Sequence, residues 1–321
     1  MSTSLPLPAL RAAFGDRLQE NVPLAPYTSA RIGGPADALV TVSSADELAG
    51  TVSRLWEMGV PYVLLGGGSN VLVSDRGVRG VAVLNRAKDV RFGNGGPLRG
   101  SDDRPKARPE RGRRVRAEAG AVFANLARRC ASHGLSGLEW AAAVPGTVGG
   151  AVYGNAGAFG GDVAGSLIQA EVLTEAGRET WLVEKMAYGY RTSALKRGDL
   201  KGVVLSAEFR LESSTKEAVS VKIAEFSARR KATQPPGASM GSMFKNPPGD
   251  FAGRLIEAAG LKGARSGAAE ISPVHANFFI NHGQTRAEDV RALVGLAQRT
   301  VAEKFGVTLE LEIELIGEWD S

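Results

Sequence analysis

Two short stretches of the sequence carry side chains that can bind an anion or move a proton. Arg191 lies between tyrosines in the sequence YGYRTS (residues 188–193), where a guanidinium can hold a carboxylate through two hydrogen bonds. Residues 241–247 (GSMFKNP) place a hydroxyl, an ammonium and an amide in one loop bounded by glycine and proline, and such loops often carry function. Taken alone, an ordinary surface arginine and a turn between helices are the simpler interpretations.

A longer stretch, residues 137–161, is suited to close approach of backbone to a large ligand. Eight of its 25 residues are glycine, and no charged side chain occurs from Trp140 to Gly161. The alanine, valine, tyrosine and phenylalanine between the glycines indicate a buried strip, whose N–H groups can bind phosphate oxygens without side chains in the way. From composition alone, this interpretation and a glycine-rich turn in an ordinary core are evenly balanced.

A second glycine turn, residues 66–70 (GGGSN), follows a predicted buried strand at 62–65 and leads into another at 71–73. A Rossmann fingerprint or a P-loop leads into a helix instead, and no Gly-Lys-Ser/Thr follows this turn. Neither mononucleotide motif therefore applies.

These stretches are connected by elements of both kinds. Capping boxes at Ser44 and Thr285 predict helix starts, and Asp250 is predicted to cap a further helix. Alternation predicts a last strand at 309–315, with Glu310, Glu312 and Glu314 on its outer face. Taken alone, this pattern indicates a face that is exposed to solvent. Further strands are predicted at 38–42, 81–84, 115–118, 168–174, 179–183, 203–211 and 278–280, and helices at 122–132 and 215–231.

Composition limits the class of protein. The 321 residues, 43% apolar and 23% charged, are typical of a globular protein with a large core. No apolar run approaches the ~20 residues that span a bilayer, and no signal peptide is evident, so we expect a cytoplasmic protein without a membrane segment. The single cysteine, Cys130, is expected to be buried, and the three histidines lack ligand spacing, so no metal site is predicted.

The net charge of +5 comes from one segment. Residues 86–116 hold eleven basic and four acidic residues, a net charge of +7, so the rest of the chain carries −2. Glycine and proline are frequent there and Phe92 is its one aromatic residue, which favours a solvated surface insertion over a nucleic-acid-binding arm.

Six motifs, in their order along the chain, resemble one family. They are YTSARIGGPA (27–36), LGGGSN (65–70), VPGTVGG followed by GNAG (144–150 and 154–157), YRTS (190–193), GSMFKNP (241–247) and LELE (309–312). Together they resemble the UDP-N-acetylenolpyruvoylglucosamine reductases, also called UDP-N-acetylmuramate dehydrogenases, from about residue 20 to 317.

The resemblance implies an α+β fold: a two-part FAD-binding region of the vanillyl-alcohol-oxidase (PCMH) type, followed by an α+β substrate-binding domain. We expect FAD-binding subdomains at 1–85 and 86–212, the second with the basic insertion at about 86–116. The substrate-binding domain is expected at 213–321, with its last strand returning to the active site. The 51-residue spacing from Arg191 to Ser242 resembles the shorter class of the family, which lacks an extra tyrosine loop over the substrate.

The activity that the resemblance implies is FAD-mediated reduction of the enolpyruvyl ether of UDP-N-acetylglucosamine by NADPH, giving UDP-N-acetylmuramate for peptidoglycan. No nucleic acid, membrane or obligate protein partner is expected. The alternative is another flavoprotein of the same fold that oxidises an alcohol or lactone, which leaves the motifs of Ser242 and Glu312 unexplained. A non-catalytic nucleic-acid-binding protein leaves the glycine stretches unexplained.

By motif, the family's roles fall on residues of this chain. The catalytic residues are Arg191, Ser242 and Glu312, with serine as the proton donor, and Tyr190, Lys245 and Asn246 are expected to contact the substrate. No histidine or cysteine lies in the flavin stretches, so FAD is expected to be held without a covalent bond. The expected cofactor-binding residues are Leu65, Gly66, Gly67, Gly68, Ser69, Asn70, Val144, Pro145, Gly146, Thr147, Gly149, Gly150, Gly154, Asn155, Ala156 and Gly157.

Overall fold

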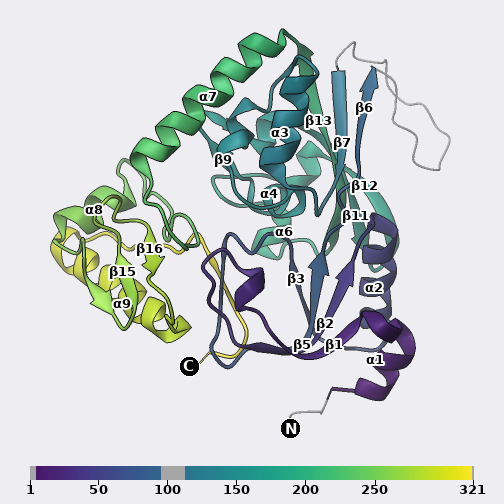
Figure 1. The fold of residues 1–321 in the computed structure, drawn as a ribbon, viewed down its shortest axis with the longest axis horizontal. Coiled ribbons are helices and arrows are strands. Elements are labelled where there is room, and N and C mark those ends of the chain that lie inside the picture. The colour runs from purple at the N-terminus through teal and green to yellow at the C-terminus, as the bar shows by residue number, and fades with distance from the viewer. Residues whose placement is uncertain (1–4, 95–112, 320–321) are drawn as a thin grey trace. The chain divides into compact units, whose positions relative to one another are not determined.

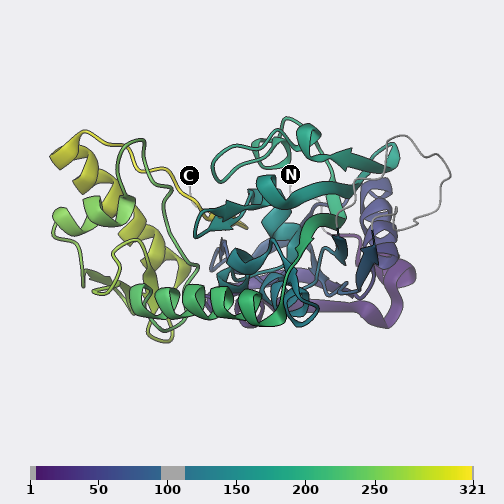
Figure 2. The ribbon, with the colours of Figure 1, turned by 90° about the horizontal axis from the view of Figure 1, so that it is seen from above.

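The structure is a computed structural model that describes residues 5–94 and 113–319. The chain forms two compact units. The first consists of Met1–Thr41, Arg54–Leu84 and Arg230–Ser321, and the second of Val42–Ser53 and Asn85–Arg229. The long helix α7 (Lys216–Thr233) is continuous across the sequence boundary between them (Figures 1 and 2).

The N-terminal part of the first unit is built on a four-stranded sheet in the order β1-β2-β5-β3. β1 and β2 are antiparallel, whereas β3 and β5 are parallel. A core that includes Leu24, Leu39 and Leu65 packs with it. The elements of this part are α1 (Leu7–Phe14), β1 (Leu18–Pro23), β2 (Pro35–Val42), β3 (Tyr62–Leu65), β4 (Val71–Val73) and β5 (Val78–Asn85), with 3-10 turns at Gly15–Arg17 and Ala25–Tyr27. Helix α2 (Ala45–Glu57) follows β2 along the chain, and its residues up to Ser53 belong to the second unit.

The C-terminal part of the first unit joins two helices to a small antiparallel sheet (Figure 1). Its core includes Phe244, Ile256, Phe279 and Leu293. The last strand, β17, pairs in parallel with β4, so the chain end returns to the N-terminal part of the unit. The elements are α8 (Ala252–Ala258), β14 (Arg265–Ser266), β15 (Ala269–Ile271), β16 (Phe279–Asn281), α9 (Ala287–Phe305) and β17 (Glu314–Ile316).

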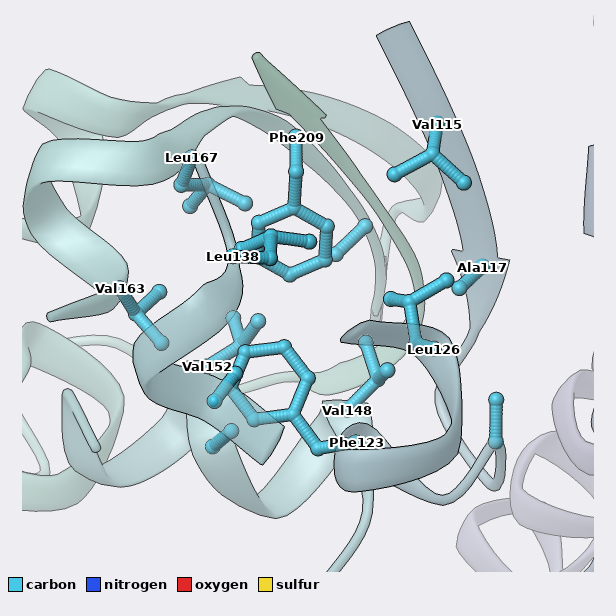
Figure 3. Close-up of a cluster of buried hydrophobic side chains, with 14 of the residues drawn as sticks. Val115, Ala117, Phe123, Leu126, Leu138, Val148, Val152, Val163, Leu167 and Phe209 are labelled. Carbon is cyan, nitrogen blue, oxygen red and sulfur yellow. The ribbon is translucent and has the colours of Figure 1, made fainter. Parts of the chain in front are cut away.

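The second unit is built on an antiparallel sheet in the order β12-β11-β13-β7-β6, with β8 paired to β13. Apolar side chains from β7, α3, α4 and β13 point toward one another in its core (Figure 3). The elements are β6 (Val90–Asn94), β7 (Arg113–Glu118), α3 (Phe123–Ser132), β8 (Leu135–Ser136), α4 (Val148–Gly154), β9 (Gly157–Ala158), β10 (Gly161–Asp162), α5 (Val163–Ser166), β11 (Leu167–Thr174), β12 (Gly177–Leu182), α6 (Ala194–Arg197) and β13 (Val203–Ser213), with 3-10 turns at Glu139–Ala143 and Val183–Met186.

Cys130 lies in that core, as predicted. Burial raises the pKa of its thiol to about 12, so the thiol stays protonated at neutral pH and behaves as a small apolar group.

The basic segment at 86–116 differs from the predicted solvated insertion. Its two ends form strands β6 and β7, which pair from Val90 with Ala117 to Asn94 with Arg113. Arg114 forms an ion pair with Glu208 on β13, and Arg116 forms one with Glu171 on β11. These acids are distant in sequence, so local composition could not reveal that they would neutralise the arginines. The remainder of the segment, 95–112, lies outside the described residues.

Three local predictions were wrong. The predicted strand 309–315 shrinks to Glu314–Ile316, because residues 309–312 have one bridge and no sheet to join. Asp250 does not cap α8; its carboxylate accepts from Phe251 N, and Asn246 Oδ1 accepts from Ala252 N at 3.1 Å instead. The helix predicted to run to about Phe305 is confirmed as α9, but Thr285 does not cap it: the capping box is formed by Arg286 and Asp289, and the first amides of α9 donate to the carboxylate of Asp75 at 2.8 and 3.1 Å.

The capping box at Ser44 is confirmed in part: Glu47 N donates to Ser44 Oγ at 3.1 Å, while the Glu47 carboxylate accepts from Ser43 N. Among the described residues, no helix has both the length and the apolar character needed to cross a membrane. Nor do three or more His, Cys, Asp or Glu side chains in that part of the chain gather in a way that could hold a metal ion.

Candidate active site

The glycine turn after β3 is shaped by close backbone contact within the first unit. Gly68 has φ +57°, and a Cβ there would lie 2.2 Å from Tyr27 O and 2.7 Å from Thr28 Cα. Only glycine fits this position. Ser29 N donates to Gly68 O at 2.9 Å, so the motif at 27–36 and the turn at 65–70 lie against each other. Two motifs 30 to 40 residues apart therefore form one structure.

The same turn is bonded to the segment that carries Glu312. Asn70 Nδ2 donates to Glu312 O at 3.1 Å, and Glu314 N donates to Asn70 O at 2.9 Å. On its other side, Glu312 N donates to Met243 O at 2.9 Å. The structure thus brings together the predicted cofactor turn, Glu312 and the loop of Ser242.

The loop at 241–247 runs antiparallel to residues 310–312. Lys245 N donates to Glu310 O at 2.9 Å, and Phe244 forms a bridge with Leu311. Side chains alternate along such a pair, so Lys245 lies on the face that also carries Glu310 and Glu312. The Lys245 ammonium forms an ion pair with Glu310. Ser242, half-buried, is one residue before this ladder and bridges Phe278 on the other side.

Asn277 holds this loop in place, and the sequence reasoning missed it. Its carboxamide accepts from Phe244 N at 2.9 Å and donates to Phe244 O at 2.8 Å, and its own carbonyl accepts from Met243 N at 2.8 Å. The side chain is only 3% exposed. A signal was present: Asn277 is a lone amide between Ala276 and Phe278 in an apolar run, and a buried polar group needs partners.

Replacing Asn277 by alanine is expected to lower the free energy of unfolding by about 2–4 kcal/mol, because both backbone groups of Phe244 would be buried without their partners. Urea unfolding of the two proteins measures the difference. Asn125→Ala on α3, whose amide bonds only an exposed arginine, is the matched control and should change the value by less than about 0.5 kcal/mol. Equal unfolding midpoints for wild type and Asn277→Ala would contradict the expectation.

In the second unit, the glycine-rich stretch packs against residues 119–123. Phe123 N donates to Gly146 O at 3.1 Å, Val148 N to Ala121 O at 2.9 Å and Gly149 N to Ala119 O at 2.8 Å. A Cβ on Gly149 would lie 2.9 Å from Ala119 Cβ, whereas one on the exposed Gly150 would have only Thr147 Oγ1 nearby, at 3.9 Å. The N–H groups of Val148 and Gly149 therefore serve the fold, and the open face of the stretch is at Gly150.

The end of α4 is tied to the arginine motif by four hydrogen bonds. Tyr188 Oη donates to Val152 O, Ser193 Oγ to Tyr153 O, Asn155 Nδ2 to Gly189 O and Arg191 Nη2 to Gly157 O, at 2.9, 2.6, 2.9 and 2.7 Å. Burial raises the pKa of the Tyr188 hydroxyl, which keeps it a donor.

Arg191 itself has φ +57°, a left-handed conformation that is uncommon for arginine and typical of functional sites. A Cβ on Gly157 would lie 3.2 Å from Arg191 Nη1, so the glycine leaves room for the guanidinium. The Cζ atom of Arg191 lies 5.4 Å from the ring centre of Tyr190, whose side chain is exposed. The structure thus brings predicted catalytic Arg191 and predicted cofactor residues together.

Each unit therefore carries part of the predicted site. The first unit holds the turn at 65–70, Ser242, Lys245, Asn246 and Glu312, and the second holds the stretch at 144–157, Tyr190 and Arg191. The amides of Asn155 and Asn246 bond to backbone, at Gly189, Ala164 and Ala252. The side chains of Asn155 and Asn246 therefore stabilise the backbone conformation of the segments next to them.

Comparison with known proteins identifies the family. A profile of the UDP-N-acetylenolpyruvoylglucosamine reductase C-terminal domain matches residues 232–316, and a profile of an FAD-binding domain matches residues 36–182. The chain is 44% identical over 305 residues to the UDP-N-acetylenolpyruvoylglucosamine reductase of Chloroflexus aggregans, covering 93% of this chain and 97% of the relative. It is 45% identical to that of Rubrobacter xylanophilus, covering 92% and 94%.

A solved structure agrees with the sequences. The UDP-N-acetylenolpyruvylglucosamine reductase of Thermus caldophilus superposes with a TM-score of 0.75 at 38% identity, covering 94% of this chain and 99% of that one. The predicted α+β fold with an FAD-binding region is confirmed. The chain belongs to the UDP-N-acetylenolpyruvoylglucosamine reductase family.

Proposed function

We propose that the protein is an FAD-dependent oxidoreductase that reduces the enolpyruvyl ether of UDP-N-acetylglucosamine to UDP-N-acetylmuramate, with NADPH as the hydride donor. The observation that carries this proposal is the bridge of Phe244 with Leu311 and its two flanking hydrogen bonds, which join the loop of Ser242 to the segment of Glu312 in a member of this family. A flavoprotein that oxidises an alcohol or a lactone would leave the presence of Ser242 and Glu312 together unexplained. The product is a peptidoglycan precursor, so we place the reaction in the cytoplasm, in cell-wall synthesis, with consequences for cell shape and division.

The domain organisation follows the two profiles. We propose that residues 1–85 and 86–212 form the two parts of the FAD-binding region and that residues 213–321 bind the substrate. The FAD-binding profile at 36–182 and the C-terminal profile at 232–316 support this division.

The glycine segments fit an FAD molecule. The strip at 140–161 carries no charge, and it has open space beside Gly150 and Gly154, as a flat, mostly apolar ring requires. We propose that this strip and the turn at 65–70 hold the cofactor without a covalent bond. When bound, FAD supplies hydride transfer between NADPH and the substrate.

The polar residues take the remaining roles. Arg191, fixed by Gly157 O, would stabilise the charge that develops at the substrate carboxylate as hydride adds to the outer enolpyruvyl carbon. Ser242 would donate the proton to the neighbouring carbon, and Glu312, in its protonated form, would stabilise the anionic intermediate by donating a hydrogen bond to it. Lys245, with Tyr190 and the loop shaped by Asn246, would contact the nucleotide sugar, whose phosphates are anionic.

The test is a spectrum followed by two mixing experiments. Purified protein should be yellow and should release its flavin on denaturation. NADPH should bleach the absorbance, and the enolpyruvyl nucleotide should restore it in the absence of oxygen. A protein that is bleached by an alcohol or lactone, and whose colour the nucleotide does not restore, would support the alternative oxidoreductase instead.

A further inference from the structure

Asn70 ends the glycine turn, and its carboxamide points to a residue 242 positions later. Its Nδ2 donates to the backbone carbonyl of Glu312 at 3.1 Å, and this contact is partly buried. The backbone carbonyl of Asn70 accepts from Glu314 N at 2.9 Å. The parallel ladder of β4 and β17 begins at the next residue of β4, where Val71 pairs with Glu314. The side chain thus adds one bond beyond the end of that ladder.

This added bond acts on Glu312. The amide of Glu312 is fixed by Met243 O, and its carbonyl is fixed by the Asn70 side chain. The ladder of β4 and β17 starts two residues later, so it does not by itself fix the peptide that follows Glu312. Without the Asn70 side chain, the carbonyl of Glu312 loses this bond, and the backbone next to the Glu312 side chain has one restraint fewer.

We infer that Asn70 is a positioning residue for Glu312, in addition to any contact that the turn makes with the cofactor. The inference rests on the role proposed above for Glu312. It means that the turn at 65–70 links cofactor binding to the geometry of the group that acts on the substrate. An amide is suited to this link because it donates to a carbonyl and carries no charge beside the Glu312 carboxyl group.

The experiment compares Asn70→Ala with wild type in three measurements. The Asn70 side chain donates to Glu312 O, and alanine keeps the backbone through which the turn would hold the cofactor, so the FAD dissociation constant, from flavin fluorescence, should change by less than about threefold. The rate of NADPH consumption by the FAD-loaded protein should stay near wild type. The rate of reduction of the enolpyruvyl nucleotide should fall on the order of 10- to 100-fold, as expected when a reacting group is displaced by about 1 Å.

A fourth measurement does not depend on activity. Hydrogen exchange in the peptide that spans 309–316 should be faster in Asn70→Ala. Gln298→Ala is the matched control, because Gln298 Nε2 also donates to a carbonyl of this segment, Leu309 O at 3.0 Å, but away from Glu312. It should leave the reduction of the nucleotide within about threefold of wild type. Asn70→Asp, isosteric and unable to donate when ionised, provides a second variant if the alanine variant does not fold.

The outcomes separate the two proposals. Failure of wild-type protein to reduce the nucleotide would overturn the proposed function. With active wild type, three results would overturn the positioning role: a rise of tenfold or more in the FAD dissociation constant with both rates slowed, no change in any measurement, or an equal loss in Gln298→Ala. The selective loss in the Asn70 variants, with faster exchange at 309–316, would support it.

Discussion

Ser242→Ala is expected to slow reduction of the enolpyruvyl nucleotide by a factor on the order of 10² to 10⁴, the usual cost of removing a positioned proton donor. Consumption of NADPH by the FAD-loaded protein should stay near the wild-type rate, because that hydride transfer needs no proton from serine. A serine hydroxyl is a poor acid in water, so its function depends on a preorganised setting. The bridges of Ser242 with Phe278 and of Phe244 with Leu311, and the bonds to Asn277, provide rigidity on both sides.

Stopped-flow absorbance follows the two steps separately. Ser239→Ala is the matched control, since Ser239 is also half-buried and lies three residues earlier on the same loop. It should leave both rates within about twofold of wild type. Equal slowing of both steps in Ser242→Ala would mean that the serine shapes the loop and gives no proton, and unchanged rates would remove it from the site.

Gly150→Val is expected to yield a folded protein that is purified without flavin, with FAD affinity reduced at least about tenfold. The added side chain projects into open space on the exposed face of α4, so little in the apoprotein opposes it. The same space is where the cofactor is proposed to contact this strip, and a branched side chain would fill it. Flavin fluorescence gives the affinity, and thermal unfolding of the apoproteins gives the stability.

Gly149→Val, one position earlier, should fail for a different reason. Its Cβ would lie 2.9 Å from Ala119 Cβ and 3.2 Å from Ala119 O, so the variant should lose about 1–3 kcal/mol of stability or more, even without cofactor. Any loss of flavin would follow from that distortion. A Gly150→Val protein as yellow as wild type would place Gly150 outside the cofactor contact, and a fully stable Gly149→Val apoprotein would contradict the packing argument.

The sequence by itself determined what local patterns encode. Helices α3 and α7, the hairpin of β11 and β12, and the buried Cys130 all matched their predictions, since periodicity, turn residues and capping act over a few positions. The motif order also predicted the family and the FAD-binding fold, because the residues of each motif and the order of the motifs can be read without coordinates.

Only the tertiary structure decided the partners that hold these motifs. Asp75 accepts hydrogen bonds from the start of α9, 212 residues later in the sequence. Asn70 donates to Glu312, 242 residues later, and Asn277 is bonded to Phe244, 33 residues earlier. Most of the alternating run 309–315 is not a strand, although the sequence predicted one. Alternation shows which faces a segment can present, but a strand also needs a neighbouring strand to pair with. Hydrogen bonds between residues far apart in sequence form only after folding brings them together, so a local pattern can show that a group such as the Asn277 amide needs a partner but not which residue that partner is.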